Sequence, residues 1–208
     1  MILSTSFLMI ENNKKKIEEL NQFTDYMHYD IMDGLFTDKA TNNYNDLLEI
    51  TQNVSKPKDV HLMVLDIKKY TDLFSKINPD YITFHLEATD KHKEIIRYIK
   101  EKGIKVGMAL NPKTHIEEII PYLNSLDLVL VMSVKAGAGG QKFIDVSDKI
   151  EFLNKYRKEH NLNYLIEVDG GINPDVINKI KQADMIVVGS FITNGDIQIQ
   201  INKIRSLI

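Results

Sequence analysis

Hydrophobic residues along this chain are concentrated in eight short segments, which are separated by longer, more polar stretches. The segments are near-continuous rather than strictly alternating, which is typical of strands that are buried on both faces. We predict strands over Ile2–Thr5, Tyr26–Met32, Asp59–Met63, Tyr81–His85, Lys105–Leu110, Leu128–Val134, Tyr164–Val168 and Met185–Val188.

Apolar residues at helical spacing occur between these strands. We predict helices over Lys14–Phe23, Ile67–Ile77, Lys91–Lys102, Ile116–Leu123, Val146–Lys158 and Ile197–Ile208. Strands that alternate with helices form parallel sheets. Eight such units predict an α/β fold of the closed (β/α)₈ or TIM-barrel type. An open, doubly wound sheet is the alternative. The five prolines all fall between the predicted strands, where a missing N–H costs little.

Length and composition narrow the class of protein. A chain of 208 residues with 43% hydrophobic content fits one domain over residues 1–208. The absence of cysteine excludes disulfides, thiolate catalysis and Cys-ligated metal centres. A net charge of -3 without a long basic run argues against nucleic-acid and membrane partners. Since no transmembrane stretch or signal peptide is recognisable, we expect a cytoplasmic protein.

Candidate metal ligands lie near the ends of the predicted strands. His28 and Asp30 are two residues apart in one strand and therefore project from the same face. His61 and Asp169 stand where apolar strands give way to loops. Imidazole and carboxylate groups suit zinc, iron, manganese or cobalt, and zinc is our first choice. The residues predict metal-assisted chemistry; buried core histidines and a helix-capping Asp30 are the structural alternative.

Glycine-rich loops follow the last three predicted strands. They contain Gly137-Ala138-Gly139-Gly140, Gly170-Gly171 and Gly189-Ser190. Glycine lets backbone N–H groups approach and surround an anion. The last loops of (β/α)₈ barrels frequently hold phosphate. We therefore predict a phosphate site there, with ordinary tight turns as the alternative.

Eight short motifs, in order along nearly the whole chain, resemble the ribulose-phosphate 3-epimerase family, a group that includes the allulose-6-phosphate 3-epimerases. Each motif alone is modest, but their combined order is specific. The motifs are Leu3-Ser4-Thr5-Ser6, His28-Tyr29-Asp30-Ile31-Met32-Asp33-Gly34, His61-Leu62-Met63-Val64, Phe84-His85-Leu86-Glu87-Ala88, Leu110-Asn111-Pro112-Lys113-Thr114, Val131-Met132-Ser133-Val134, Gly139-Gly140-Gln141-Lys142-Phe143 and Glu167-Val168-Asp169-Gly170-Gly171.

The resemblance implies a ribulose-phosphate-binding TIM barrel with one divalent metal ion per subunit, expected to be Zn²⁺, with Fe²⁺, Mn²⁺ or Co²⁺ as alternatives. The implied ligands are His28, Asp30, His61 and Asp169, and the two aspartates would also be the acid–base pair. The implied substrate contacts are Ser6, His61, Gly137, Ala138, Gly139, Gly140, Gly170, Gly171, Gly189 and Ser190. Met32, Met63 and Met132 would line the reaction centre, although buried methionines are also common in plain core.

The implied reaction inverts carbon 3 of a ketose phosphate. Removing a proton beside a ketone and returning one to the opposite face requires two opposed acid–base groups, and a metal would stabilise the enediolate. We expect D-ribulose 5-phosphate and D-xylulose 5-phosphate as the pair, with D-allulose 6-phosphate and D-fructose 6-phosphate as the alternative. The resemblance also implies a role in carbohydrate metabolism, in the pentose phosphate pathway, and a homo-oligomer, either dimer or hexamer.

Three departures from the family pattern bear on this expectation. Leu35–Lys39 replaces the usual His-Phe-Val-Pro-Asn, Ala136 and Ala138 replace a proline and an aromatic residue in the phosphate loop, and Thr5 replaces a proline. A catalytically silent metal- and phosphate-binding barrel is therefore an alternative of another class. A barrel decarboxylase or aldolase-type lyase is a third class, but that group tends to have a lysine between early aspartates, which His28–Asp33 lacks.

His85 and Glu87 share one face of a predicted strand and its continuation. They could support the metal ligands from behind, or they could form a purely structural hydrogen bond.

Overall fold

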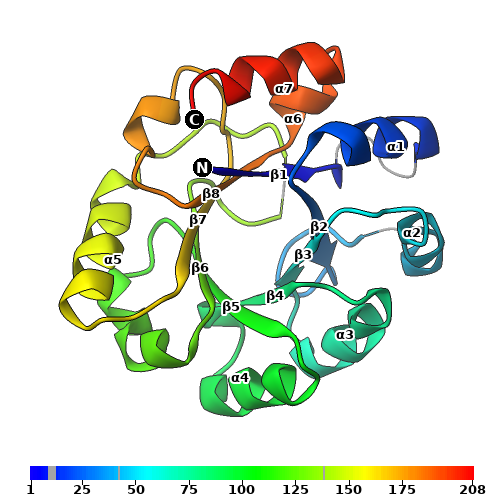
Figure 1. Ribbon diagram of the computed structural model, residues 1–208. Coiled ribbons are helices and arrows are strands. Elements are labelled where there is room, and N and C mark those ends of the chain that lie inside the picture. The colour runs from blue at the N-terminus through cyan, green and yellow to red at the C-terminus, as the bar shows by residue number, and fades with distance from the viewer. Residues whose placement is uncertain (9–12, 42, 138) are drawn as a thin grey trace.

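The structure, a computed structural model, describes residues 1–8, 13–41, 43–137 and 139–208. Eight parallel strands form a closed barrel in which each strand pairs with the next and β8 pairs with β1 (Figure 1). This confirms the predicted barrel over the open sheet. The strands are β1 (Ile2–Ser6), β2 (Tyr26–Met32), β3 (Lys58–Met63), β4 (Tyr81–His85), β5 (Lys105–Leu110), β6 (Leu128–Met132), β7 (Leu165–Asp169) and β8 (Met185–Val188).

Helices surround the barrel and connect its strands. The α-helices are α1 (Lys14–Phe23), α2 (Tyr44–Thr51), α3 (Ile67–Phe74), α4 (His92–Glu101), α5 (Ser147–Glu159), α6 (Ser190–Thr193) and α7 (Ile197–Arg205). Short 3₁₀ segments are η2 (Ser75–Ile77), η3 (Leu86–Ala88), η4 (Ile116–Ser125) and η5 (Ile177–Lys179). Within the described part of the chain, no helix has the length and apolar character needed to cross a membrane.

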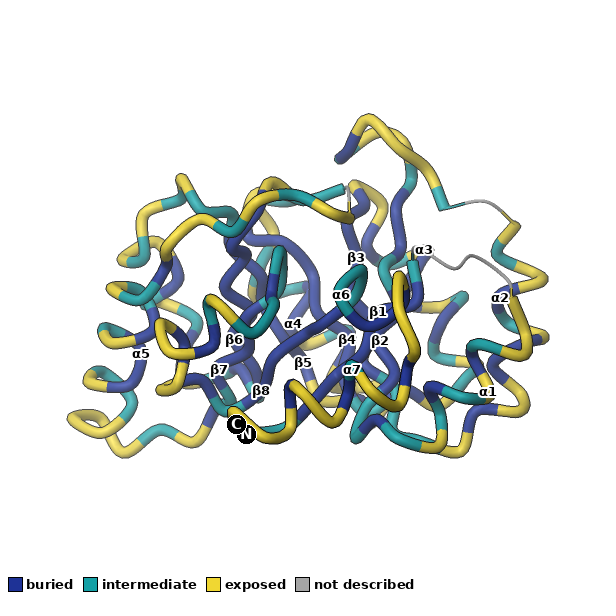
Figure 2. Tube along the Cα trace, turned by 90° about the horizontal axis from the view of Figure 1, so that it is seen from above, coloured by how far each residue is buried: buried dark blue, intermediate teal, exposed yellow. Residues whose placement is uncertain are grey.

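Alternation along the strands divides the core into two layers. Residues such as Leu62 and Phe84 point outward and pack beneath the helices, where they belong to the larger apolar cluster. Inward-pointing Leu128, Leu130 and Met185 form a smaller cluster inside the barrel. Figure 2 shows the strands as buried and the outer turns of the helices as exposed. Both faces of the sheet are therefore covered, as the near-continuous apolar strands predicted.

Some predicted boundaries were wrong. The segment from Ile116 is a 3₁₀ helix rather than an α-helix, because Pro121 lacks the N–H that an α-helix interior requires. Strand β6 ends two residues early, at Met132, and beyond this end the Ser133 hydroxyl donates to the Asp169 and Gly170 carbonyls at 2.9 and 2.6 Å. Helix α7 ends at Arg205, before the predicted Ile208.

Helix α2 was not among the predicted helices. It begins after Asn43, whose side chain accepts a hydrogen bond from the Asp46 N–H and whose backbone has a φ of 49°. Leu47 and Ile50 are its buried apolar residues. Two buried apolar positions in eight residues give a weak periodic signal, and tertiary packing stabilises the helix.

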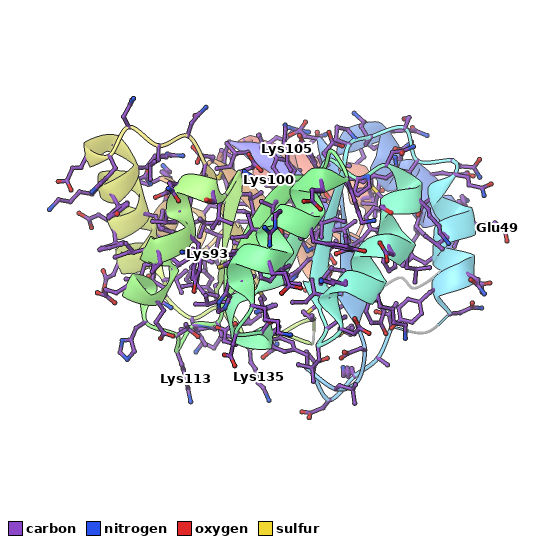
Figure 3. All side chains as sticks on the ribbon, turned by 90° about the horizontal axis from the view of Figure 1, so that it is seen from below. Glu49, Lys93, Lys100, Lys105, Lys113 and Lys135 are labelled. Carbon is purple, nitrogen blue, oxygen red and sulfur yellow. The ribbon has the colours of Figure 1, made fainter. Side chains whose placement is uncertain are left out.

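Parallel strand register brings the candidate site residues to one end of the barrel. Asp30 on β2 is paired with His61 on β3, Met132 on β6 with Asp169 on β7, and Ser6 on β1 with His28. Since every strand runs in the same direction, their carboxyl ends form one rim. Lys113 and Lys135, which follow β5 and β6, project from this end, whereas Lys105 at the start of β5 lies at the other (Figure 3).

Candidate functional site

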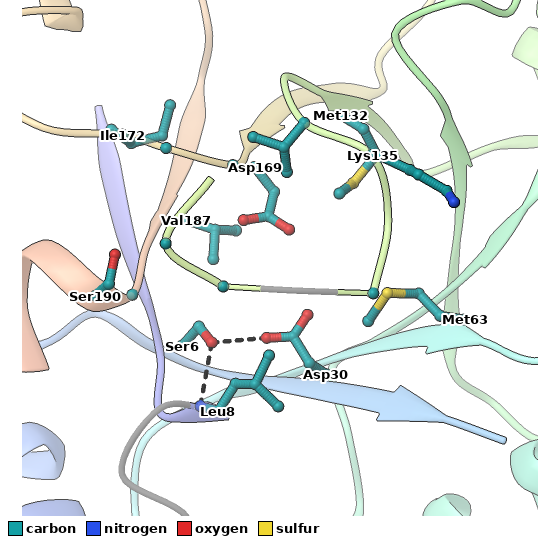
Figure 4. A pocket seen from close by; sticks show the side chains of 17 residues that line it. Ser6, Leu8, Asp30, Met63, Met132, Lys135, Asp169, Ile172, Val187 and Ser190 are labelled. Atoms are coloured by element: carbon teal, nitrogen blue, oxygen red, sulfur yellow. Dashed lines mark hydrogen bonds between the residues drawn. The ribbon is translucent and has the colours of Figure 1, made fainter. Parts of the chain in front are cut away.

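A cavity opens at the carboxyl ends of the strands. The carboxylates of Asp30 and Asp169 point toward one another across it (Figure 4). The cavity is lined by Ser6, Leu8, Asp30, Met63, Met132, Val134, Lys135, Gly137, Gly139, Gly140, Asp169, Gly170, Gly171, Ile172, Val187, Gly189 and Ser190.

Four predicted metal ligands converge beside this cavity. One donor atom each from His28, Asp30, His61 and Asp169 lies within 4.8 Å of all the others. Asp30 Oδ1 is 3.4 Å from His28 Nε2 and 3.4 Å from His61 Nδ1, and His61 Nδ1 is 3.9 Å from Asp169 Oδ2. Two ligand atoms about 2.1 Å from a tetrahedral zinc ion lie about 3.4 Å apart, so these separations fit a shared cation.

The two histidine nitrogens that face the aspartates are buried and lack hydrogen-bond partners among the described residues. They are His28 Nε2 and His61 Nδ1. Buried polar atoms are nearly always satisfied, so unpaired nitrogens aimed at two carboxylates indicate a ligand. The donor set is chemically suited to a divalent transition metal.

His28 is held from behind by a buried carboxylate. Its Nδ1 lies 2.6 Å from Asp59 Oδ2, and Asp59 also accepts a 3.3 Å hydrogen bond from the Ser4 hydroxyl. A carboxyl oxygen of Glu167 lies within 4.8 Å of both His28 and Asp59 donor atoms. Burial and the Asp59 charge raise the pKa of Glu167 well above its usual range, which favours the protonated form of this side chain.

The two cavity aspartates have opposite electrostatic settings. Burial alone would raise the pKa of Asp30, but the charge of the neighbouring His28, together with His61, outweighs it and holds that pKa far below its usual range. Burial, with the nearby charges of Asp30 and Asp59, raises the pKa of Asp169 to about 7. Near neutral pH one carboxyl group is therefore ionised while the other is partly protonated.

Ser6 links the end of β1 to this pair. Its hydroxyl donates a 2.6 Å hydrogen bond to Asp30 Oδ2, which leaves Asp30 Oδ1 facing the two histidines. The hydroxyl oxygen also accepts a hydrogen bond from the Leu8 N–H at 3.3 Å. Ser6 thus fixes the orientation of the Asp30 carboxylate at the cavity wall.

Glycines are sterically required where the late loops meet the cavity. A Cβ at Gly171 would lie 2.7 Å from the Phe143 backbone nitrogen, and one at Gly137 would lie 2.7 Å from the Thr37 side chain. The φ values of Gly137 and Gly171, +107° and +63°, also favour glycine. These loops therefore approach closely enough to surround a small anion with backbone groups.

Most residues predicted to touch substrate do line the cavity. They are Ser6, Gly137, Gly139, Gly140, Gly170, Gly171, Gly189 and Ser190. His61 lies behind the wall and is fully buried. Met63 and Met132 line the cavity, whereas Met32 is buried and is not among its lining residues. Ala138 lies outside the described residues.

Sequence reasoning missed several residues of the site. Asp59 and Glu167 each lie two positions before a predicted ligand, so the period-two rule that placed His28 with Asp30 could have found them too. Lys135 carries the one positive side chain among the described lining residues. Its side chain is 82% exposed and lies 3.8 Å from Asp38.

The loop after β2, which departs from the family pattern, packs beside the site, against His85 and Gly137. The Asp33 carboxylate accepts hydrogen bonds from the backbone N–H groups of Leu35, Phe36 and Leu65 at 2.8 to 2.9 Å. The Phe36 ring packs on the His85 ring with centroids 4.7 Å apart. The Asp33 carboxylate therefore holds the backbone of this loop in place, and the loop covers the His85 ring.

Comparison with known proteins supports the interpretation of this site as an enzyme active site. Residues 1–193 match the Ribulose-phosphate 3 epimerase family. A ribulose-phosphate 3-epimerase of Helicobacter pylori is 39% identical over 194 residues, which cover 92% of this chain and 88% of that protein. A protein of the same name from Bacillus subtilis is 36% identical over 193 residues, covering 91% of this chain and 88% of the relative.

Solved structures with a similar fold are more distant in sequence. The 3-hexulose-6-phosphate synthase of Salmonella typhimurium superimposes with a TM-score of 0.73 at 19% identity, covering 100% of this chain and 98% of that one. At this identity the likeness concerns the barrel fold alone.

Proposed function

The chain belongs to the ribulose-phosphate 3-epimerase family and is an epimerase, and we propose that it inverts carbon 3 of D-ribulose 5-phosphate to give D-xylulose 5-phosphate. The observation that carries this proposal is the pair of carboxylates, Asp30 and Asp169, that face each other across one cavity. Inversion beside a ketone needs a proton acceptor on one face of the carbon and a proton donor on the other.

We propose that His28, Asp30, His61 and Asp169 hold one divalent cation, with Zn²⁺ as the expected ion. Their nitrogen and oxygen donors, the 4.8 Å limit on their separations and the two unpaired ring nitrogens support this assignment. Such an ion, when bound, supplies Lewis-acid stabilisation of the negative charge that develops on the substrate oxygens.

The protein's own groups would move the protons. In one direction Asp30, ionised and oriented by Ser6, removes the carbon-3 proton, and Asp169 returns a proton to the opposite face. In the reverse direction the roles exchange. The opposite pKa shifts of the two carboxyl groups agree with this division, because one must start ionised and the other protonated.

Substrate would be held at the other end by its phosphate. We propose that the backbone groups of Gly139, Gly140, Gly171 and Ser190, all of which line the cavity, bind it. Met63 and Met132 give an apolar wall near the reacting carbon, which excludes water from the enediolate.

A hexulose phosphate is the second candidate substrate. The loop over residues 33–40 supports this second candidate. Its sequence differs from the family pattern, and its Thr37 side chain packs directly against Gly137. This loop could set the length of sugar that the cavity accepts. D-allulose 6-phosphate is the corresponding substrate.

Specificity constants on the two phosphates test the proposed function. We expect the Zn²⁺-loaded protein to have the higher kcat/KM with D-ribulose 5-phosphate and to lose activity after chelation. A higher value with D-allulose 6-phosphate would transfer the assignment to the hexulose. Metal-loaded protein without activity on either compound would favour the catalytically silent barrel.

A further inference from the structure

We propose that His85 and Glu87 are positioning residues that fix the protonation pattern of His61, so that His61 Nδ1 presents its lone pair to the metal site. This inference rests on the proposed metal-dependent function, because it concerns how one ligand is prepared. Neither residue touches the cavity: His85 is fully buried at the end of β4, and Glu87 lies in η3 just beyond it.

A continuous line of hydrogen bonds runs outward from His61. Its Nε2 lies 2.8 Å from His85 Nε2, and His85 Nδ1 lies 3.1 Å from Glu87 Oε2. The two imidazole rings are nearly parallel, with centroids 5.0 Å apart and an interplanar angle of 29°. Two nitrogens at hydrogen-bond distance require exactly one proton between them, so the state of one ring dictates that of the other.

Glu87 determines which atom donates and which accepts in each of these hydrogen bonds. Its Oε1 accepts hydrogen bonds from the Asn111 N–H at 2.8 Å and from the Thr114 hydroxyl. A carboxylate that already accepts two hydrogen bonds is held ionised, so its second oxygen can only accept from His85. His85 therefore carries its proton on Nδ1, and its Nε2 accepts a hydrogen bond from the protonated Nε2 of His61. The remaining nitrogen, His61 Nδ1, is left unprotonated.

His61 Nδ1 is the nitrogen that faces the cavity carboxylates, 3.4 Å from Asp30 Oδ1 and 3.9 Å from Asp169 Oδ2. The opposite pattern would place a proton on this nitrogen and block it as a ligand. It would also turn an unprotonated His85 Nδ1 toward the Glu87 carboxylate, so that two lone pairs would face each other. The carboxylate excludes that arrangement.

The two metal-site histidines are thus prepared by carboxylates in different ways. Asp59 contacts His28 Nδ1 directly and leaves Nε2 free, whereas Glu87 acts on His61 through an intervening ring and leaves Nδ1 free. Phe36 covers the intervening ring of His85. This cover keeps water from supplying an alternative hydrogen-bond partner to the relay.

Glu87→Gln exchanges the donor and acceptor roles along these hydrogen bonds without changing the size of the side chain. The Asn111 N–H and the Thr114 hydroxyl require an acceptor, so they hold the amide oxygen at the position of Oε1. The amide NH₂ then points at His85 Nδ1 and donates to it. The His85 proton moves to Nε2, and the His61 proton moves to Nδ1.

Ring protonation is read directly by long-range ¹H–¹⁵N correlation spectra of the full chain. In the wild-type protein without added metal, we expect His61 protonated at Nε2 and His85 at Nδ1, and in Glu87→Gln the reverse. Competition with a chelator should show Zn²⁺ affinity about 10- to 100-fold weaker in the variant. Glu151→Gln on the exposed side of α5 makes the same chemical change and should alter neither readout.

If the variant fails to fold, the wild-type spectrum alone tests the proposal. A wild-type His61 that is protonated at Nδ1 would overturn it. A folded Glu87→Gln protein with unchanged ring protonation and unchanged Zn²⁺ affinity would overturn it as well. Because ring protonation is measured without substrate, absence of epimerase activity would count against the proposed function and leave this test intact.

Discussion

Asp30 and Asp169 carry the same carboxyl group, yet their neighbours move their pKa values in opposite directions. Asp30 lies between two histidines and accepts a hydrogen bond from Ser6, whereas Asp169 lies in a buried position close to other carboxylates. In the proposed mechanism, the environment of each residue, rather than its chemical type, would therefore assign the initial proton acceptor and donor.

Asp169→Asn tests this assignment at the residue scale. Asparagine has nearly the same shape but cannot exchange the proton, so we expect kcat to fall by roughly 10²- to 10⁴-fold while the circular dichroism spectrum is unchanged. Asp148→Asn, an exposed position at the start of α5, is the matched control and should keep the wild-type rate. An Asp169→Asn protein with near wild-type turnover would remove Asp169 from the mechanism.

At the scale of elements, loops on neighbouring strands determine the shape of the phosphate end. The loop after β7 packs against the loop after β6 so closely that Gly171 has no room for a side chain: a Cβ would lie 2.7 Å from the Phe143 nitrogen and 2.8 Å from the Gln141 carbonyl oxygen. These are backbone atoms, which cannot rotate away as a flexible side chain would. The two loops are therefore coupled.

Gly171→Ala should push the loop after β6 out of place. We expect affinity for inorganic phosphate to fall, and KM for the sugar phosphate to rise, by about tenfold, the effect of losing roughly one hydrogen bond to a charged group. Gly103→Ala is the control, because Gly103 has a similar φ of +75° with no atom within 4 Å of its Cβ position. Equal KM values in the two variants would refute the coupling.

Another element-scale contact joins the ends of the chain. Asp25, between α1 and β2, accepts hydrogen bonds from the Leu3 N–H at 2.9 Å and from Arg205 of α7 at 2.8 and 3.2 Å. Burial raises the pKa of Asp25, but Arg205 and the Leu3 N–H outweigh it and hold that pKa below 3.8. A lowered pKa means that this carboxylate stabilises the fold above pH 4 and ceases to do so as pH falls below it.

Asp25→Asn should therefore lower the free energy of unfolding by about 1 kcal/mol at pH 7, a value discounted for the partial exposure of the pair. The difference from wild type should shrink in urea titrations as pH falls from 5 to 3. Glu49→Gln, in an exposed pair with Lys14, should show no measurable change. A difference that stays constant with pH would mean that the Asp25 charge is not responsible.

At the scale of the whole molecule, the barrel brings together candidate metal ligands from β2, β3 and β7, which are far apart in sequence. Strand order, the approximate position of each strand and the four candidate ligands could be predicted, because buried parallel strands have a clear apolar pattern and their carboxyl ends share one rim. The period-two rule was enough to place His28 and Asp30 together.

Other features depend on contacts that no local pattern contains. The proposed choice between Nδ1 and Nε2 in His61 rests on contacts with His85, Glu87 and a loop residue, Asn111, which come from separate parts of the chain. Helix α2 has only a short apolar stripe, and its start depends on the left-handed backbone of Asn43. Tertiary packing determines such features, so they could not be predicted from local sequence patterns.

Exchange of the carbon-3 proton of D-ribulose 5-phosphate with solvent deuterium tests the central claim most directly, because it detects proton transfer itself rather than net conversion. With Zn²⁺-loaded protein in D₂O, the account predicts loss of the carbon-3 proton signal in both pentulose phosphates, and no loss after chelation. Retention of that signal in the presence of folded, metal-loaded protein would contradict the account.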